Sequence, residues 1–245
     1  DTRLPQRFLE LSLRSLKQAE SQTVQLNQQS FQQANFLETL MQNLQLKPQP
    51  LSLKPSLEET IVAAVDTSTI KIGETNTGLV IAVRGANIWK QGGNYRYTRL
   101  GPFIFHITEE NKREVYNTLE RAYFGFADDY SHQGTPNLLQ MPTRIANLLE
   151  RWLQTMLSKT MDNGLILFDG SLTSGTPDNR TQRMKEILGV ARKRGNVVLA
   201  FSKMTTLRVN GHLITDFLPK HRPPCLFETV NLKPKPPTVL LGDVY

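Results

Sequence analysis

Hydrophobic residues recur at helical spacing near the N-terminus, at Phe8, Leu11, Leu16, Ala19 and Leu26. Apolar positions three and four residues apart fall on one face of an α-helix. The pattern predicts an N-terminal helical arm over residues 1–47, rich in glutamine, followed by a proline-broken linker over 48–57. Such a face packs either on its own domain or on another subunit, and we favour the second.

Three runs of apolar and β-branched residues follow the linker and predict strands. They cover residues 61–65, 78–88 and 95–107, with a bend expected at Gly101-Pro102 in the third. The connections between them are short and contain glycine and asparagine, which favours antiparallel neighbours.

The rest of the chain alternates between helical and strand patterns. Helices are predicted over 111–124, 143–159 and 178–194, and buried strands over 165–168 and 197–201. Two strands joined through a helix imply a right-handed parallel crossover. A meander of three strands followed by such units predicts an α/β fold, namely a ribonuclease H-like mixed sheet flanked by helices over residues 58–245.

Charge and composition narrow the class of protein. Lysine and arginine number 29 against 22 acidic residues, giving a net charge of +7 and a pI near 9.6. This excess favours a polyanion such as nucleic acid as a partner. The single cysteine, Cys225, excludes an intrachain disulfide. With no secretory signal pattern and no apolar stretch near the roughly 18–20 residues that span a bilayer, we expect a cytoplasmic protein without membrane contact.

Two aspartates follow apolar strand patterns. Asp66 is expected to end the strand over 61–65, and Asp169 the strand over 165–168. Asp is also common in turns and at helix N-caps, but two carboxylates at the rim of neighbouring strands repel each other unless a cation lies between them. Glu150, at the edge of the apolar stripe of the helix over 143–159, is the third candidate. The alternative for Glu150 is a surface glutamate paired with an arginine. Mg²⁺ and Mn²⁺ prefer such oxygen ligands.

Further residues are candidates for contact with a nucleic acid. Lys203 follows the strand over 197–201 and could hold a phosphate, unless it is simply an exposed lysine at a strand end. Cations could bind the phosphate backbone and aromatic rings could stack on bases, although surface charge and core packing are the ordinary roles of such residues. These candidates are Arg192, Lys193, Arg194, Tyr95, Tyr97 and Phe103.

Taken together, these motifs resemble the NurA nuclease family, from about residue 58 to the end. The likeness lies in Val65-Asp66-Thr67-Ser68, the helical Glu150, Phe168-Asp169-Gly170-Ser171-Leu172 and Ser202-Lys203. The resemblance implies a ribonuclease H-like homodimer that cleaves DNA with Mn²⁺, or Mg²⁺, with two ions expected. It implies 5′–3′ exonuclease and single-strand endonuclease activity in DNA end resection and double-strand break repair, alongside a HerA-type hexameric ATPase. Asp66, Glu150 and Asp169 would bind metal, and Lys203 would assist.

The chain departs from this family in three ways. Thr67 stands where the family's first motif has glycine, which removes a tighter backbone turn. A further metal-site residue near the family's C-terminus has no clear counterpart, and Asp243 is the nearest acid to the chain end. The chain is also short for the family, which suggests either a truncated form or the lack of disordered parts. The alternative is therefore a DNA-binding or adaptor subunit of a translocase complex that kept the fold and lost full catalysis.

Two other enzyme classes share parts of these motifs. Haloacid dehalogenase-type phosphohydrolases use a similar Asp-Gly segment, but their chemistry needs a nucleophilic aspartate two residues earlier, where this chain has Leu167. Sugar kinases and actin-like ATPases can present an Asp-Thr-Ser loop to phosphate. They require a second phosphate loop, and Gly73 and Gly78 do not form one.

Overall fold

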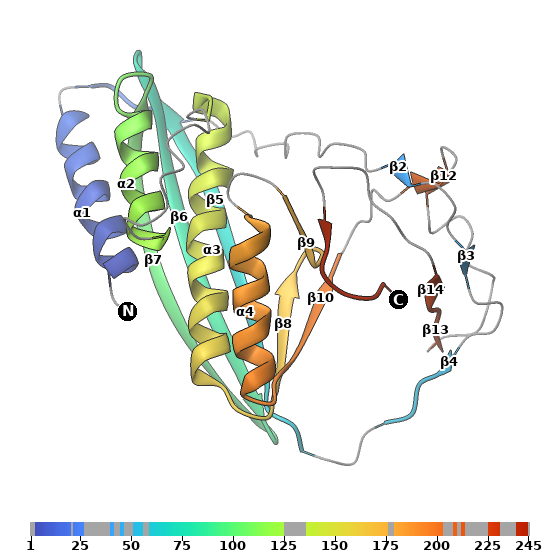
Figure 1. The fold of residues 1–245 in the computed structure, drawn as a ribbon. Coiled ribbons are helices and arrows are strands. Elements are labelled where there is room, and N and C mark those ends of the chain that lie inside the picture. The colour runs from blue at the N-terminus through green and yellow to red at the C-terminus, as the bar shows by residue number, and fades with distance from the viewer. Residues whose placement is uncertain are drawn as a thin grey trace.

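The structure is a computed structural model of residues 1–245. It describes residues 3–20, 22–26, 40–41, 45–46, 51–55, 59–124, 136–175, 179–202, 208–209, 212–213, 225–230 and 239–244. These residues form a twisted central sheet, a layer of helices and a set of two-residue strands (Figure 1).

The central sheet is mixed. Its order is β10-β8-β5-β6-β7, and the short β1 pairs with β5 outside this order. An antiparallel meander forms one half, from β5 (Val62–Glu74), β6 (Gly78–Gln91) and β7 (Asn94–Thr108). Parallel strands form the other half, where β8 (Leu165–Asp169) pairs with both β5 and β10 (Val197–Phe201). The expected α/β class with a mixed sheet is confirmed.

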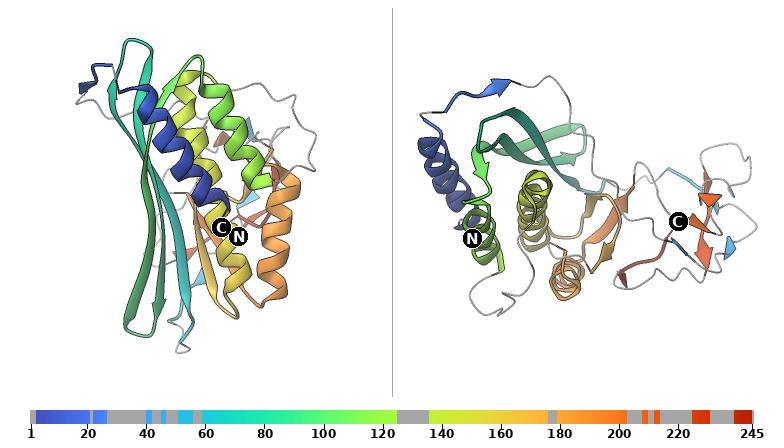
Figure 2. Two further views of the ribbon diagram at one scale, coloured as in Figure 1. Left: turned by 90° about the vertical axis from the view of Figure 1, so that its left-hand side faces the viewer. Right: turned by 90° about the horizontal axis from the view of Figure 1, so that it is seen from above.

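Four helices lie together on one side of this sheet (Figure 2). They are α1 (Arg3–Gln18), α2 (Lys112–Phe124), α3 (Met141–Thr160) and α4 (Thr181–Lys193). Helix α4 connects β8 to the parallel β10, as the sequence predicts for a crossover. The three helices predicted after the meander are confirmed to within three residues at each end.

The prediction of one helix over residues 1–47 is wrong for the described residues after Gln18, namely 19–20, 22–26, 40–41 and 45–46. Helix α1 ends at Gln18, and β1 (Gln25–Leu26) pairs antiparallel with the far end of β5, opposite Gly73 and Glu74. Two more short strands follow, β2 (Leu40–Met41) and β3 (Gln45–Leu46). Pairing with an open strand edge satisfies backbone groups that helical periodicity alone had assigned to a helix. The glutamines at 28–33 lie outside the described residues.

Helix α1 packs on the chain's own core and is not a free arm. Leu4 and Phe8 are completely buried, and the Phe8 ring lies 5.2 Å from that of Phe103 and 5.8 Å from that of Phe105. Phe103 is itself only 7% exposed. The suggestion that Phe103 stacks on a nucleic-acid base is therefore wrong, because its faces already pack against other side chains.

Strand β5 is longer than predicted. The sequence pattern ends this strand at Asp66, but β5 continues to Glu74 and stays paired with β6 throughout, apart from a register shift between Lys71 and Gly73. Its second half contains Thr67, Thr69, Ile70 and Ile72, and β-branched residues suit an extended backbone. Asp66 thus lies inside a long strand and not at its end.

The bend predicted in the third strand coincides with an irregularity between β6 and β7. The register passes from Val83 opposite Phe103 to Gly85 opposite Leu100, so the β7 strand carries an extra residue there. Gly101 lies at this point with a φ of 87°, a conformation that favours glycine.

Most of the remaining elements are short and pair with distant parts of the chain. Strand β15 lies on β9, β13 on β4, β14 on β3, and β11 on both β12 and β2. The bounds are β4 (Leu51–Ser52), η1 (Leu138–Gln140), β9 (Thr173–Ser174), β11 (Arg208–Val209), β12 (His212–Leu213), β13 (Cys225–Leu226), β14 (Thr229–Val230) and β15 (Val239–Leu240). In the part of the chain that the structure describes, every helix is too short or too polar to cross a bilayer.

Candidate carboxylate site

Asp66 and Asp169 lie side by side on adjacent strands. The parallel pairing of β5 with β8 ends at Val65 opposite Phe168, and the two aspartates are the next residue on each strand. Neighbouring strands are about 4.8 Å apart, so the two backbones bring the carboxylates into the same small region. Both aspartates are exposed. The sequence prediction that these two residues meet is therefore supported by the strand register.

Both aspartates occupy strand positions on the face of the sheet that lies away from the helices. Val65 and Phe168, each 2% exposed, belong to the core beneath the helices. Side chains alternate between the two faces along a strand, so the next residue on each strand is placed on the opposite face. We call this opposite face the open face. Two residues before each aspartate, Ala64 of β5 and Leu167 of β8 lie on the same face and are partly exposed.

Glu150 approaches from the helix side. It lies on α3, half-buried, and two side chains bind its carboxylate oxygens. The Thr67 hydroxyl donates a hydrogen bond to Oε2 at 3.4 Å, and the Gln154 amide donates one to Oε1 at 2.9 Å. Gln154 is completely buried. These contacts hold Glu150 over β5, one residue away from Asp66.

Close packing of α3 on the sheet makes this contact feasible. A Cβ atom on Gly85 of β6 would lie 2.6 Å from the Leu153 Cδ1 atom, well inside contact distance. Glycine at this position therefore lets the helix come nearer than any other residue would allow. Gly85 is paired with Thr67, so the closest approach occurs beside the strand position that binds Glu150.

The pKa of Glu150 is affected by the charges of both aspartates. Burial is the main cause that raises the pKa of Glu150, Arg151 lowers it, and the negative charges of Asp169 and Asp66 raise it further. A nearby like charge disfavours the ionised form of a carboxyl group. The glutamate predicted from helix periodicity thus lies close enough to both predicted aspartates to be affected by their charge.

Strand β8 ends earlier than its neighbour β5 on the side of the candidate site. Strand β8 stops at Asp169, whereas β5 continues for eight more residues beyond Asp66. Among the described residues, the same edge of β5 is next paired by β1, at Gly73 and Glu74. Beyond Asp66, β5 therefore no longer pairs with β8, and Glu150 contacts this part of β5 through Thr67.

The donor set fits a divalent cation chemically. Three carboxylates and the Thr67 hydroxyl supply oxygen atoms only, which suits Mg²⁺ or Mn²⁺ and not a thiolate-preferring metal. A desolvated carboxyl beside two more is also an arrangement that a cation stabilises. Within the described ranges, however, no three His, Cys, Asp or Glu side chains are gathered closely enough to hold a metal ion as they stand. The physical reason is that Glu150 and the two aspartates belong to opposite sides of the sheet.

The loop after Asp169 is tied to neighbouring segments. Gly170 has a φ of 92°, and its N–H donates to the Phe201 carbonyl at 2.9 Å, which joins the ends of β8 and β10. Two residues on, the Leu172 carbonyl accepts from Leu241 N–H at 2.8 Å. The C-terminal segment with Asp243 therefore runs beside the loop that follows Asp169, without adding Asp243 to a metal-holding group among the described residues.

Other predicted residues are not brought to this site. Arg192, Lys193 and Arg194 lie at the C-terminal end of α4, where β10 begins, and Asp169 pairs with the opposite end of β10. Arg194 instead binds Asp162 at 2.7 Å. The crossover therefore carries these three cations to the far end of the parallel strands, away from the carboxylates, and their contact with a DNA backbone stays a prediction. Lys203 lies outside the described residues.

Two residues that position Glu150 were missed as functional candidates. Thr67 was noted only as a departure from glycine, and it now supplies a hydroxyl to Glu150. Gln154 stands one helical turn after Glu150, and a buried polar residue at that spacing was the available signal.

Comparisons with protein-family models, curated proteins and solved structures found no match to this chain. What the site can do therefore follows from its chemistry. Clustered carboxylates on an exposed face can hold cations, and through them anionic groups, or can accept protons.

Proposed function

We propose that this protein is a metal-dependent deoxyribonuclease that hydrolyses phosphodiester bonds at Asp66, Glu150 and Asp169. One observation carries the proposal. The strand register places Asp66 and Asp169 next to each other on adjacent strands, and Glu150 contacts Thr67, the next residue of β5. Repulsion among the three carboxylates is a cost that structural roles do not require and that bound cations remove.

The resemblance to NurA nucleases supports the same reaction. It associates these residues with a ribonuclease H-like fold, which we propose for the mixed sheet, and with DNA as substrate. The net charge of +7 is compatible with a polyanionic substrate. From the same resemblance we propose 5′–3′ exonuclease and single-strand endonuclease activity, a homodimer, a HerA-type hexameric ATPase as partner, and a cytoplasmic role in end resection and double-strand break repair.

The chain's own residues have separable roles in this proposal. Asp66, Glu150 and Asp169 would hold Mn²⁺ or Mg²⁺. Two such ions, when bound, make a water molecule more acidic and neutralise charge on the phosphate. Thr67 and Gln154 hold both oxygens of Glu150 and so fix the direction of its carboxylate. Lys203 would bind a phosphate oxygen.

A second candidate function is a DNA-binding or adaptor subunit without full catalysis. The position of Glu150 on the opposite side of the sheet from the two aspartates favours this alternative. It predicts retention of DNA without cleavage at any divalent metal concentration.

The deciding experiment compares three proteins in one assay. Degradation of labelled single-stranded DNA is measured with Mn²⁺, and with a chelator, for wild type, Asp169→Asn and Asp162→Asn. The last is a matched control, because Asp162 is an exposed aspartate before the other end of β8. We expect Asp169→Asn to lower the rate at least about 100-fold with an unchanged circular dichroism spectrum, and the control to keep wild-type activity. Full activity of Asp169→Asn would remove Asp169 from the site, and an inactive wild type that still binds DNA would favour the adaptor.

A further inference from the structure

The open face continues from the carboxylates onto a hairpin that projects beyond the helices. The outer parts of β6 and β7 form this hairpin, whose tip is at residues 92–93. Tyr95 and Tyr97 are 67% and 65% exposed, and Ile88 beside them is 47% exposed. Large apolar and aromatic side chains held out in solvent on a defined strand suggest a surface that binds something.

Each tyrosine ring lies close to a cation. The Lys90 Nζ atom is 6.0 Å from the centre of the Tyr95 ring, and the Arg99 guanidinium is 5.4 Å from the centre of the Tyr97 ring. Lys90 is directly opposite Tyr95 in the register, and Arg99 follows Tyr97 by two residues. All four side chains therefore lie on one face, as two adjacent pairs of an aromatic ring and a positive charge.

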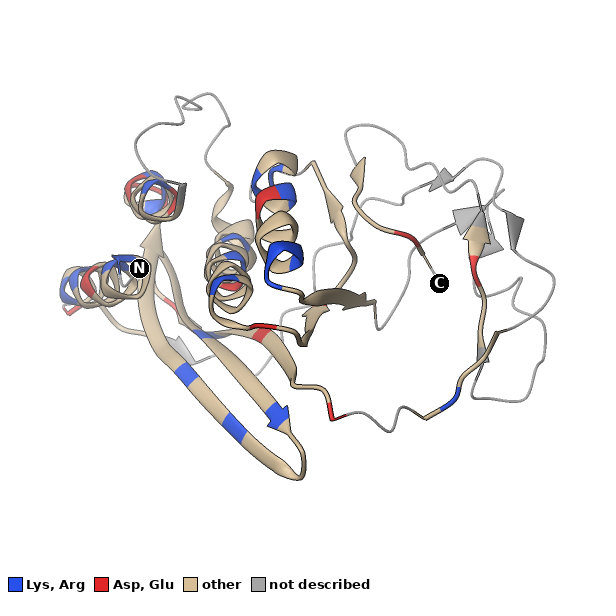
Figure 3. Cartoon of the chain, turned by 60° about the horizontal axis from the view of Figure 1, so that its bottom comes forward, with Lys and Arg blue, Asp and Glu red and all other residues tan. Residues whose placement is uncertain are grey.

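The hairpin is basic and has no acid of its own. Residues 84–99 contain Arg84, Lys90, Arg96 and Arg99 and neither Asp nor Glu (Figure 3). Arg84 donates to the Ser68 hydroxyl at 2.8 Å, and Arg96, opposite Trp89, lies on the other face. Glu59 lies at the tip, where its Oε1 atom would be 3.5 Å from a Cβ on Gly92. The charged side chains beside the two tyrosine rings are Lys90 and Arg99.

The strand register places this surface in line with the candidate site. Arg99 is opposite Ala86, and Ala86 is opposite Asp66. Two strand spacings correspond to about 10 Å between the Arg99 and Asp66 backbones. In the other direction Asp169 is opposite Phe201 of β10, which is 57% exposed. The two aspartates therefore have an aromatic residue and positive charge on one side and an aromatic residue on the other.

We infer that the open face binds a single unpaired nucleic-acid strand, whose bases stack on Tyr95 and Tyr97 and whose phosphates lie near Lys90 and Arg99. Alternating aromatic rings and cations suit this ligand, because every base has an aromatic face and every nucleotide a phosphate. A duplex hides its base faces in its own stack and so gains only the phosphate contacts. The inference rests on the proposed function, in that this strand would be the one presented to Asp66 and Asp169.

Binding can be tested separately from cleavage. The full chain in chelator is titrated with a short fluorescent oligodeoxynucleotide, with the oligoribonucleotide of the same sequence, and with the DNA duplex. We expect the single strands to bind more tightly than the duplex, and Tyr97→Ala to weaken single-strand binding roughly 5- to 100-fold. Tyr97→Phe keeps the ring and should bind like wild type. Comparison of the two single strands shows whether DNA is preferred over RNA.

The salt dependence of binding gives an independent test of the two cations. Replacement of both Lys90 and Arg99 by Gln should reduce the slope of log affinity against log salt by about 1.4. Lys185→Gln is the matched control, because Lys185 is exposed on α4 on the helix side. Equal affinity of wild type and Tyr97→Ala for single strands would overturn the inference. So would a change of oligomeric state in Tyr97→Ala by sedimentation with unchanged binding, which would identify the face as a protein interface. If Tyr97→Ala loses binding while wild type cleaves no DNA, the inference stands and the nuclease proposal fails.

Discussion

The two faces of the central sheet differ in how they are covered, although β10 is apolar on both. On the helix side Val65 and Phe168 are each 2% exposed and Ile166 is completely buried. On the open face of β10, Val197, Leu199 and Phe201 are 57%, 39% and 57% exposed. A strand that is apolar on both faces is usually covered on both. The comparison assigns the helix side to stability and leaves the open face for binding.

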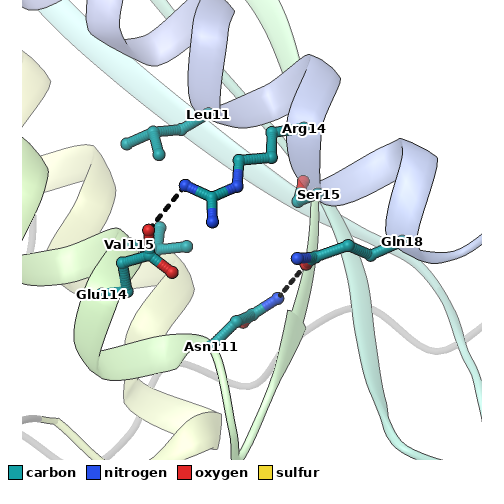
Figure 4. A pocket seen from close by; sticks show the side chains of 7 residues that line it. All are labelled: Leu11, Arg14, Ser15, Gln18, Asn111, Glu114 and Val115. Atoms are coloured by element: carbon teal, nitrogen blue, oxygen red, sulfur yellow. Dashed lines mark hydrogen bonds and ion pairs between the residues drawn. The ribbon is translucent and has the colours of Figure 1, made fainter.

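Polar contacts also connect the elements of the helix side. Figure 4 shows the space between α1 and α2, where Arg14 binds Glu114 at 2.6 Å and the Asn111 amide donates to Gln18 at 3.3 Å. Exposed ion pairs contribute only about 0–1 kcal/mol. These contacts orient α1, whereas its buried apolar side chains supply most of its stabilisation.

The strongest test of the comparison is a core truncation on the helix side. Phe8→Ala removes a completely buried ring that packs on Phe103 and Phe105. We expect the free energy of unfolding to fall by about 3–5 kcal/mol, because both the transfer energy of the ring and a cavity are involved. Chemical denaturation followed by circular dichroism measures this. A loss below about 1 kcal/mol would show that α1 is not part of the cooperative core.

The sequence correctly predicted the elements in which the spacing of apolar residues follows the side that is buried. The helices after the meander and the strand at 165–168 were found because apolar spacing decides which side packs on the core. Two errors share one cause. The helix over 1–47 and the end of the strand at Asp66 were assigned from local pattern, whereas pairing with another strand decided both.

Local sequence pattern also limited the prediction of the candidate site. The strand register supports the prediction that Asp66 meets Asp169, since each directly follows an apolar run on its strand. The sequence could not show that β8 ends beside a longer β5, because strand length depends on the partner. It therefore missed the contact of Thr67 with Glu150.

A smaller loss is expected from a buried hydrogen bond on the helix side. The Ser15 hydroxyl accepts from the His106 backbone N–H at 2.9 Å and donates to the Ser12 carbonyl at 2.9 Å. Ser15→Ala leaves that N–H buried without its acceptor, which should lower the free energy of unfolding by about 1–3 kcal/mol. Ser68→Ala, at an exposed serine, should stay within about 0.5 kcal/mol of wild type in the same denaturation experiment. Equal effects of the two substitutions would contradict the conclusion that the buried hydrogen bond of Ser15 stabilises the fold.

The pH dependence of stability tests the burial of Glu150 and the effect of the nearby charges on it. The pKa of Glu150 is raised from its ordinary value of 4.5, first by burial and then by Asp169 and Asp66 against the opposing effect of Arg151. Between 4.5 and the raised pKa the folded state binds more protons than the unfolded state, so stability falls as pH rises through this window. Glu150→Gln removes this dependence and can keep both side-chain contacts. Thermal unfolding in chelator across this range should give a flatter profile for the variant, and identical profiles would mean that burial of Glu150 has no energetic consequence.

The smallest effect is expected from the counterpart of Phe8 on the open face. Phe201→Ala removes the same side chain from the same sheet, but the ring is 57% exposed at the end of β10. Little surface returns to water and no enclosed cavity forms, so the free energy of unfolding should stay within about 0.5 kcal/mol of wild type. Denaturation at two protein concentrations separates an intrinsic effect from one caused by association, because only the latter changes with concentration. A large loss that depends on concentration would show that another chain covers the open face in solution, and the distinction between a stabilising face and a binding face would then describe one subunit and not the assembly.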